Sequence, residues 1–288
     1  MKFADPKNDI AFKKIFGDEN HKEVLISFLN SVLDFTDRQK IIDVKLDNTY
    51  QLSTIEELKD TILDVKATNE NGEEFIVEMQ KKDGGDFSKR SLYYTSKAYV
   101  NQIDVAEKYL ELKKVYYIAL VDFNIFDSKN FISRHLIINQ ETTKQDLKDF
   151  EFTFIELKKF NLPLNECDTI AKKWIYFINN ASSLDLIPAE FDNIQAFQTA
   201  FNTANTYTWK KKELEYYDKV SLKKGDDINA LNKAEKKGIE KGIEKGIEQG
   251  KHQEKLEIAK NSILQGLDDK TIAMITGLDI STIQALRN

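Results

Sequence analysis

The strongest constraint on the fold is a pair of alternating segments separated by a short turn. Apolar and polar side chains alternate along residues 63–68 and again along residues 74–80. A period of two is typical of half-buried β-strands. The dipeptide Asn71-Gly72 between the segments indicates a turn. The sequence therefore predicts an antiparallel hairpin here.

The register of this hairpin follows from the positions of its apolar residues. A two-residue turn would set Val65 opposite Glu78 and mix apolar with charged side chains. A three-residue loop ending at Gly72 sets Val65 opposite Val77 and Asp64 opposite Glu78. We choose the second register, because a slip of one residue moves every side chain to the other face. Its polar face carries the side chains of Asp64, Lys66, Glu78 and Gln80.

The chosen register brings two carboxylates together, those of Asp64 and Glu78. Opposed like charges cost stability unless a cation lies between them. Lys66 on the same face is one source of positive charge. A divalent ion is a better one, since Mg²⁺ binds carboxylates, carbonyl oxygens and water. Taken alone, the pattern favours a solvated strand face over a metal site, and both interpretations stay open.

Composition excludes several classes of protein. The 288 residues carry a formal net charge of −6 and have a pI of about 5.4, which argues against tight binding of nucleic acid through a basic surface. Any contact with nucleic acid is expected to be transient or metal-dependent. Cys167 is the only cysteine and the three histidines are scattered, so no disulfide framework or zinc site is expected. No apolar run has spanning length and the first residues do not resemble a signal peptide, so we expect a cytoplasmic protein without a membrane segment.

The remaining pattern indicates an α/β fold. Residues 115–121 form a continuous apolar run, as expected of a strand buried on both faces. A buried strand directly after a helix suggests helices flanking a mixed sheet. The other expected elements are helices near residues 8–16, 24–33 and 87–112, strands near residues 41–52, 131–138 and 152–157, and helices from residue 165 onward.

The C-terminal region has a pattern of its own. Residues 237–250 repeat Gly-Ile-Glu-Lys with a period of four, which places glycine in a stripe along a helix. A self-pairing helix and a marginal charged spacer explain this stripe equally well. Residues 269–276 and 281–287 predict two short helices around a turn, similar to a helix-turn-helix. The last helix carries only Arg287 as a basic residue, so a small packing module is at least as good an interpretation.

Several segments together resemble a known family. They are Asp5-Pro-Lys-Asn-Asp9-Ile-Ala-Phe12-Lys-Lys-Ile-Phe16-Gly17, Leu63-Asp64-Val-Lys-Ala-Thr68, Glu78-Met-Gln80 and Arg90-Ser-Leu-Tyr-Tyr94, followed by the glycine repeat and the final helical hairpin. The chain resembles the Rpn family of recombination-promoting nucleases, also labelled transposases, within the PD-(D/E)XK nuclease superfamily. The resemblance extends over nearly the whole chain.

The resemblance implies a domain organisation. It implies a restriction-endonuclease-like mixed sheet flanked by helices, with a helical C-terminal extension. We expect a nuclease core over residues 1–160 and a helical region packed on it over residues 161–234. The repeat helix and the terminal hairpin would then occupy residues 235–288.

The resemblance also implies the site. Asp64 and Glu78, with the Met79 carbonyl, would hold Mg²⁺ or Mn²⁺. Gln80 would stand where most members of the superfamily have lysine, and Asp9 would be an additional acidic residue. Lys66 could donate the missing positive charge. This interpretation requires the two carboxylates to face one side of the sheet, with neither locked against an arginine.

The activity implied is that of a metal-dependent DNA endonuclease linked to recombination or mobile elements. DNA would be the substrate, and a homo-oligomer could form through the C-terminal helix. Two alternatives remain. One is a catalytically inactive nuclease-fold interaction protein that oligomerises through its helical tail. The other is a DNA-binding regulator that uses the terminal hairpin, and the acidic net charge makes it the weaker alternative.

Overall fold

A mixed six-stranded sheet forms the centre of the computed structural model, which describes residues 1–47, 65–103 and 108–287. The order of the strands is β1-β2-β3-β4-β6-β5. Strands β3, β4 and β6 run parallel to one another, and β1, β2 and β5 add antiparallel pairs at the two sides. The strands are β1 (Val44–Leu46), β2 (Val65–Asn69), β3 (Glu74–Gln80), β4 (Val115–Val121), β5 (Ile132–Leu136) and β6 (Phe150–Glu156).

The predicted register of the β2–β3 hairpin is confirmed. Val65 lies opposite Val77 and Ala67 lies opposite Phe75. The Asn69 N–H donates to the Glu73 carbonyl at 3.0 Å, so three residues form the loop. Gly72 ends this loop with φ of 79°, a conformation that favours glycine. Asp64 lies outside the described residues, and so do residues 48–52 of the strand predicted from residue 41.

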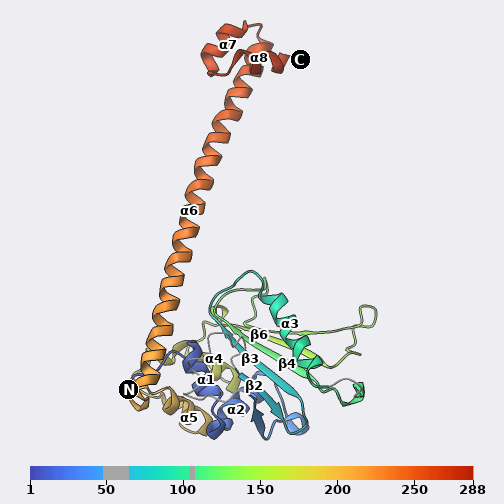
Figure 1. Cartoon of the computed structure of the whole chain (residues 1–288), viewed down its shortest axis with the longest axis vertical. Coiled ribbons are helices and arrows are strands. Elements are labelled where there is room, and N and C mark those ends of the chain that lie inside the picture. Colours follow the sequence, from blue (N-terminus) through green and yellow to red (C-terminus); the bar gives the residue numbers. More distant parts are fainter. Residues whose placement is uncertain (48–64, 104–107, 288) are drawn as a thin grey trace. The chain divides into compact units, whose positions relative to one another are not determined.

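Helices cover both faces of the sheet, as predicted (Figure 1). Helix α3 (Phe87–Val100) packs on one face, where Ile76 and Tyr117 belong to the same apolar cluster as Phe87. The opposite face is covered by α1 (Asp9–Phe16), α2 (Lys22–Val32), α4 (Ile170–Asn180) and α5 (Gln195–Ala204). The fold is therefore the α/β arrangement of restriction-endonuclease-like proteins.

The larger core, on the side of α1 and α2, is rich in aromatic rings. Trp174 is fully buried, and its ring lies 4.0 Å from that of Phe197 and 5.7 Å from that of Phe16, centroid to centroid. Packing of this kind stabilises a core beyond the burial of apolar area. The helices that follow the sheet in sequence are thus tied to the helices that precede it.

The helix predicted over residues 87–112 is shorter than expected. It ends at Val100, and a separate short 3₁₀ turn occupies Tyr109–Glu111. The side chain of Gln102 explains part of this, since it accepts from the Lys113 N–H at 2.7 Å and donates to the Lys113 carbonyl at 3.1 Å. These bonds fix the chain just before β4 and would be lost if the helix continued.

The chain divides into two compact units, Met1–Ser221 and Leu222–Asn288. Helix α6 (Lys211–Leu264) is continuous over 54 residues. At its start Glu213 accepts from the Lys210 N–H at 2.7 Å and from Lys14 Nζ at 2.6 Å. In the described part of the chain, no helix combines the length and apolar character needed to cross a bilayer.

The second unit ends in the two short helices predicted from the sequence. They are α7 (Asp269–Thr276) and α8 (Ile280–Arg287), joined at Gly277 with φ of 66°. Ile272 and Ile283 pack with Ala259 of α6 in a small core. Arg287 bonds to Asp269 at 2.8 Å, so the one basic residue of the last helix serves within the hairpin.

Candidate active site

Glu78 is a charged residue placed inside the molecule. It lies near the carboxyl end of β3, a central strand, and is 3% exposed. The alternation of the strand puts Glu78 on the same face as Ile76, beneath α3. Burial of a carboxylate is unfavourable unless the carboxylate is paired. Carboxylates buried in this way are often found at functional sites.

Among the described residues, two side chains hold the carboxylate of Glu78. The Tyr117 hydroxyl donates to Oε2, and Arg90 Nη2 donates to Oε1 at 3.2 Å. Burial raises the pKa of Glu78, while the bond from Tyr117 and the charge of Arg90 act in the opposite direction. The carboxyl is thus both desolvated and held by specific donors.

The contact with Arg90 differs from the expectation that no arginine would bind the site. Arg90 belongs to α3, whose packing on the sheet brings its guanidinium over the end of β3. The pair has a single hydrogen bond, and the Arg90 side chain is 31% exposed. Arg90 therefore neutralises Glu78 from the solvent side and does not enclose it.

Sequence reasoning missed both partners of Glu78. Tyr117 sits in the apolar run of β4, which was interpreted only as a strand buried on both faces. Glu78 pairs with Ala119 of the parallel strand β4, and Tyr117 lies two residues before Ala119. The phenol of Tyr117 is therefore on the same face of the sheet as Glu78, beneath α3. The signal that could have identified Tyr117 is the pair of tyrosines in this run, because a buried hydroxyl needs a partner. Arg90 stood in the family motif but was given no role.

Lys66 does not supply charge to Glu78 in this structure. Its Nζ lies 3.0 Å from Glu74 Oε2 and 3.4 Å from Asp47 Oδ2. Glu74 lies closer to the hairpin loop than Lys66 does, because Glu74 pairs with Thr68 whereas Lys66 pairs with Ile76. Asp47 directly follows the last residue of β1. Among the described side chains, the cation bonded to Glu78 is Arg90.

Gln80 and Met79 follow Glu78 along the strand. The Gln80 carbonyl accepts from the Asp122 N–H at 2.9 Å and so faces β4. Backbone groups alternate in direction, so the Met79 carbonyl faces the β2 side, where Asp64 is expected. The Gln80 side chain is half-buried, and its amide nitrogen donates to the Lys82 carbonyl at 3.2 Å.

Asp9 begins α1, which lies at the same edge of the sheet as Gln80. Lys7 Nζ lies 3.2 Å from Asp122 Oδ2, just past the end of β4. Lys81 Nζ lies 2.7 Å from Asp5 Oδ2, just past the end of β3. Helix α1 starts there because the Asn8 side chain caps it by accepting from the Ile10 N–H. The ion pairs fix the chain just ahead of Asp9 at the carboxyl ends of the strands.

The predicted metal site depends on a residue outside the described ranges. Within those ranges, no three histidine, cysteine, aspartate or glutamate side chains form a group that could hold a metal ion. The donors that remain, the Glu78 carboxylate and the Met79 carbonyl, are oxygen ligands of the kind that Mg²⁺ and Mn²⁺ prefer. They fit a hard divalent ion once a second carboxylate joins them.

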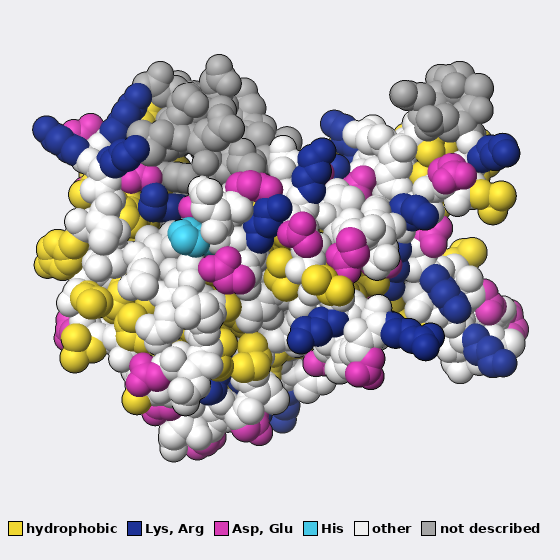
Figure 2. Space-filling view, turned by 90° about the horizontal axis from the view of Figure 1, so that it is seen from below, with side chains coloured by type: hydrophobic (Ala, Val, Ile, Leu, Met, Phe, Trp, Pro, Cys, Tyr) yellow, Lys and Arg dark blue, Asp and Glu magenta, His cyan; other side chains and the backbone are white. Residues whose placement is uncertain are grey.

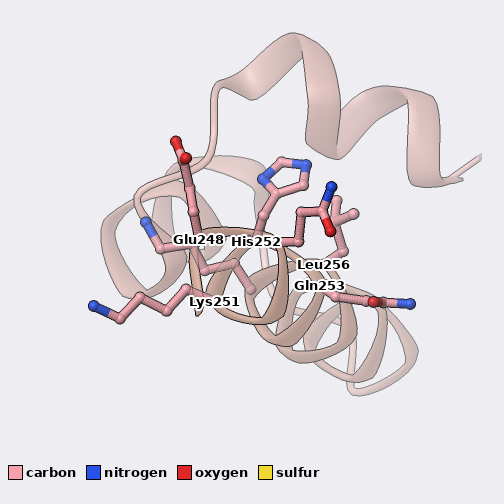
Figure 3. A pocket seen from close by; sticks show the side chains of 7 residues that line it. Glu248, Lys251, His252, Gln253 and Leu256 are labelled. Carbon is pink, nitrogen blue, oxygen red and sulfur yellow. The ribbon is translucent and has the colours of Figure 1, made fainter. Parts of the chain in front are cut away.

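The hollow on α6 has a different character. It has a volume of about 810 Å³ and is lined by residues between Glu248 and Leu256. Figure 3 shows the side chains of Glu248, Lys251 and His252 pointing in different directions from one stretch of helix. They do not converge on a common point, so this hollow is no candidate for a metal or substrate site.

Charge on the surface is mixed. Figure 2 shows basic and acidic side chains interspersed over the face that it presents. Among the described residues, lysines pair with acids, as in the Lys114–Glu151 and Lys159–Glu156 salt bridges. This distribution agrees with the net charge of −6 and gives no broad basic surface on that face.

A sequence model described as PD-(D/E)XK nuclease family transposase matches residues 6–234. The matched part includes α1, the β2–β3 hairpin with Glu78 and helix α3 with Arg90. No curated protein and no solved structure gave a match.

Proposed function

Because the chain belongs to the PD-(D/E)XK nuclease family transposases, we propose that it is a Mg²⁺- or Mn²⁺-dependent DNA endonuclease. The substrate is the phosphodiester backbone of DNA, and the setting is recombination or the movement of mobile elements in the cytoplasm. The acidic net charge supports a contact with DNA that depends on the metal ion.

One observation supports this proposal above the others. A carboxylate that is 3% exposed lies near the end of the central strand β3 on the face beneath α3. It is held by a hydroxyl and a guanidinium, and the guanidinium also lies 3.9 Å from Asp86. A buried acid with a raised pKa at a strand end is typical of a functional site.

In this proposal each residue has a defined task. Glu78, the Met79 carbonyl and Asp64 would hold the ion, and Asp9 would bind water or a second ion from the start of α1. When bound, a divalent ion neutralises charge on the phosphate and lowers the pKa of water. Gln80 orients the attacking water through its side-chain amide, since it has no charge to donate.

The test is cleavage of supercoiled plasmid by the purified full chain with Mg²⁺ or Mn²⁺. The wild type should nick the plasmid, and both Asp64→Asn and Glu78→Gln should reduce the rate about 100-fold or more. Glu74→Gln is the matched control, because Glu74 shares the strand and the face but bonds to Lys66. Equal cleavage by the wild type and both site variants rejects the assignment.

A homo-oligomer through α6 is a second part of the proposal. Ile239, Ile243 and Ile247 are 54–58% exposed, and a Cβ built on Gly242 would meet no atom within 4 Å. An apolar stripe of this kind suits close approach of a second helix. Sedimentation of the full chain and of a chain ending at residue 234 tests it: only the full chain should associate. If the full chain is a monomer at all concentrations, this part is rejected and the endonuclease proposal stands.

A further inference from the structure

We propose that Arg90 is the mobile cation of the site, and that it exchanges between two anions. Without metal its guanidinium binds Glu78. When a divalent ion takes Glu78, the guanidinium is released to a phosphate of the DNA. This inference rests on the proposed function. It adds Arg90 to the site, which the amino acid at position 80 alone would not indicate.

The first support is the absence of an alternative cation at Glu78 in the described residues. Gln80 is neutral, and Lys66 is bonded to Glu74 and Asp47. Lys81, the next residue along the chain, forms an ion pair with Asp5 at 2.7 Å. Arg90 therefore supplies the positive charge at Glu78, and it does so from α3. A lysine at position 80 would supply that charge from β3.

The second support is that the guanidinium is only partly used. Arg90 gives Glu78 one hydrogen bond through Nη2. Its Nε is buried and has no hydrogen-bond partner among the described residues, and Asp86 Oδ1 lies 3.9 Å from it. An Nε–Nη2 edge matches two oxygens of a phosphate, so half of a bidentate anion site is unsatisfied.

The third support is the way in which α3 holds the residue. Phe87 and Ser91 on either side of Arg90 are buried and fix the helix on the sheet. The guanidinium carbon lies 5.3 Å from the centre of the Phe87 ring, and the side chain is 31% exposed. The backbone is therefore fixed while the charged group borders solvent, where a DNA phosphate would approach.

The proposal has a thermodynamic signature with two opposite signs. Arg90 and a metal ion compete for Glu78, so removing the guanidinium should strengthen metal binding. Arg90 and the DNA phosphate attract each other, so the same change should weaken DNA binding. A residue with only a structural role would not move the two affinities in opposite directions.

The first arm of the test is calorimetric titration of the full chain with Mn²⁺ in the absence of DNA. Arg90→Gln should bind Mn²⁺ about fivefold more tightly than the wild type or better. Lys89→Gln is the matched control, since it removes one charge from the exposed side of the same helix and should leave Mn²⁺ affinity unchanged. Arg90→Lys retains the charge and should stay close to the wild type.

The second arm measures DNA binding by fluorescence anisotropy with a short duplex in Ca²⁺, over a series of salt concentrations. Loss of one phosphate contact in Arg90→Gln should reduce the slope of log affinity against log salt by about 0.9. Arg90→Lys should keep that slope but bind more weakly, because an ammonium cannot form the two parallel bonds of a guanidinium.

Either of two results overturns the role of Arg90: Mn²⁺ affinity of Arg90→Gln equal to or below that of the wild type, or an unchanged salt slope. The failure of the proposed function looks different. If the wild type binds no Mn²⁺, both proposals are rejected. If the wild type binds Mn²⁺ and cleaves DNA but Arg90→Gln gives either of those two results, only the role of Arg90 is rejected.

Discussion

Glu78 combines two opposed physical effects at one carboxyl. Burial beneath α3 removes water from the charged form and raises its pKa, while the Tyr117 hydroxyl and Arg90 stabilise that form. The net effect is an acid that keeps its proton to a higher pH than usual. The raised pKa is thus the balance of desolvation against these two partners.

The first prediction concerns the dependence of stability on pH. The folded protein binds the Glu78 proton more tightly than the unfolded chain, whose usual pKa is 4.5. Stability from this group is therefore complete below pH 4.5 and is lost as pH rises through the raised pKa. Glu78→Gln has no proton to lose. Its free energy of unfolding relative to the wild type should increase from pH 4.5 upward, as measured by urea denaturation. A difference that does not change with pH would contradict the buried carboxyl.

The second prediction concerns Tyr117. Tyr117→Phe leaves Glu78 Oε2 buried without its donor, which should lower the free energy of unfolding by about 1–3 kcal/mol at pH 8. Tyr116→Phe is the control on the adjacent position of β4, whose side chain lies on the opposite face. Urea denaturation of both variants decides the matter: equal losses would show that the Tyr117 hydroxyl has no special partner.

Part of the site could be predicted from residues alone. Glu78 was identified because strand alternation assigns it to a face, which is a local property. Tyr117 reaches it through the parallel pairing of β4 with β3, and Arg90 reaches it through the packing of α3 on the sheet. No period in the sequence reports either contact. Lys66 shows the limit of local reasoning, since it lies on the predicted face but bonds to Glu74 and Asp47.

At the scale of elements, the β2–β3 hairpin was the most predictable part of the fold. Its apolar face and its loop length allow only one register, and the structure confirms that register. The end of α3 was less predictable, because Gln102 fixes the chain through bonds to Lys113, eleven residues away. A side chain that bonds to backbone ahead of the next strand leaves no periodic signal.

The third prediction tests the loop that sets this register. Gly72 has φ of 79°, and a Cβ built there would lie 3.3 Å from Lys113 Cγ. Gly72→Ala should lower the free energy of unfolding by about 1–2 kcal/mol, because the left-handed conformation strains alanine. Gly72→Asn should lose less, since asparagine tolerates that conformation. Equal losses in urea denaturation would attribute the effect to crowding at Lys113 and not to backbone strain.

At the scale of the whole molecule, the family match and the compact units divide the chain differently. The match extends to residue 234, whereas the first compact unit ends at Ser221. Both boundaries fall within α6, so the helix that starts on the nuclease fold continues without a break into the glycine repeat. The sequence left the repeat open between a self-pairing helix and a charged spacer. It did not predict a helix continuous from residue 211, because the lysines of residues 210–224 are interspersed with acidic residues and indicate a solvated face.

Binding of Mn²⁺ to the full chain, to Asp64→Asn and to Glu78→Gln decides whether the two carboxylates form one metal site. The wild type should bind the ion and each variant should lose most of that affinity, because both carboxylates are ligands of the same ion in the proposed site. Glu74→Gln, on the same strand and face, should bind as the wild type does. Undiminished binding by both site variants would show that the ion is held elsewhere and that Asp64 and Glu78 are not its ligands.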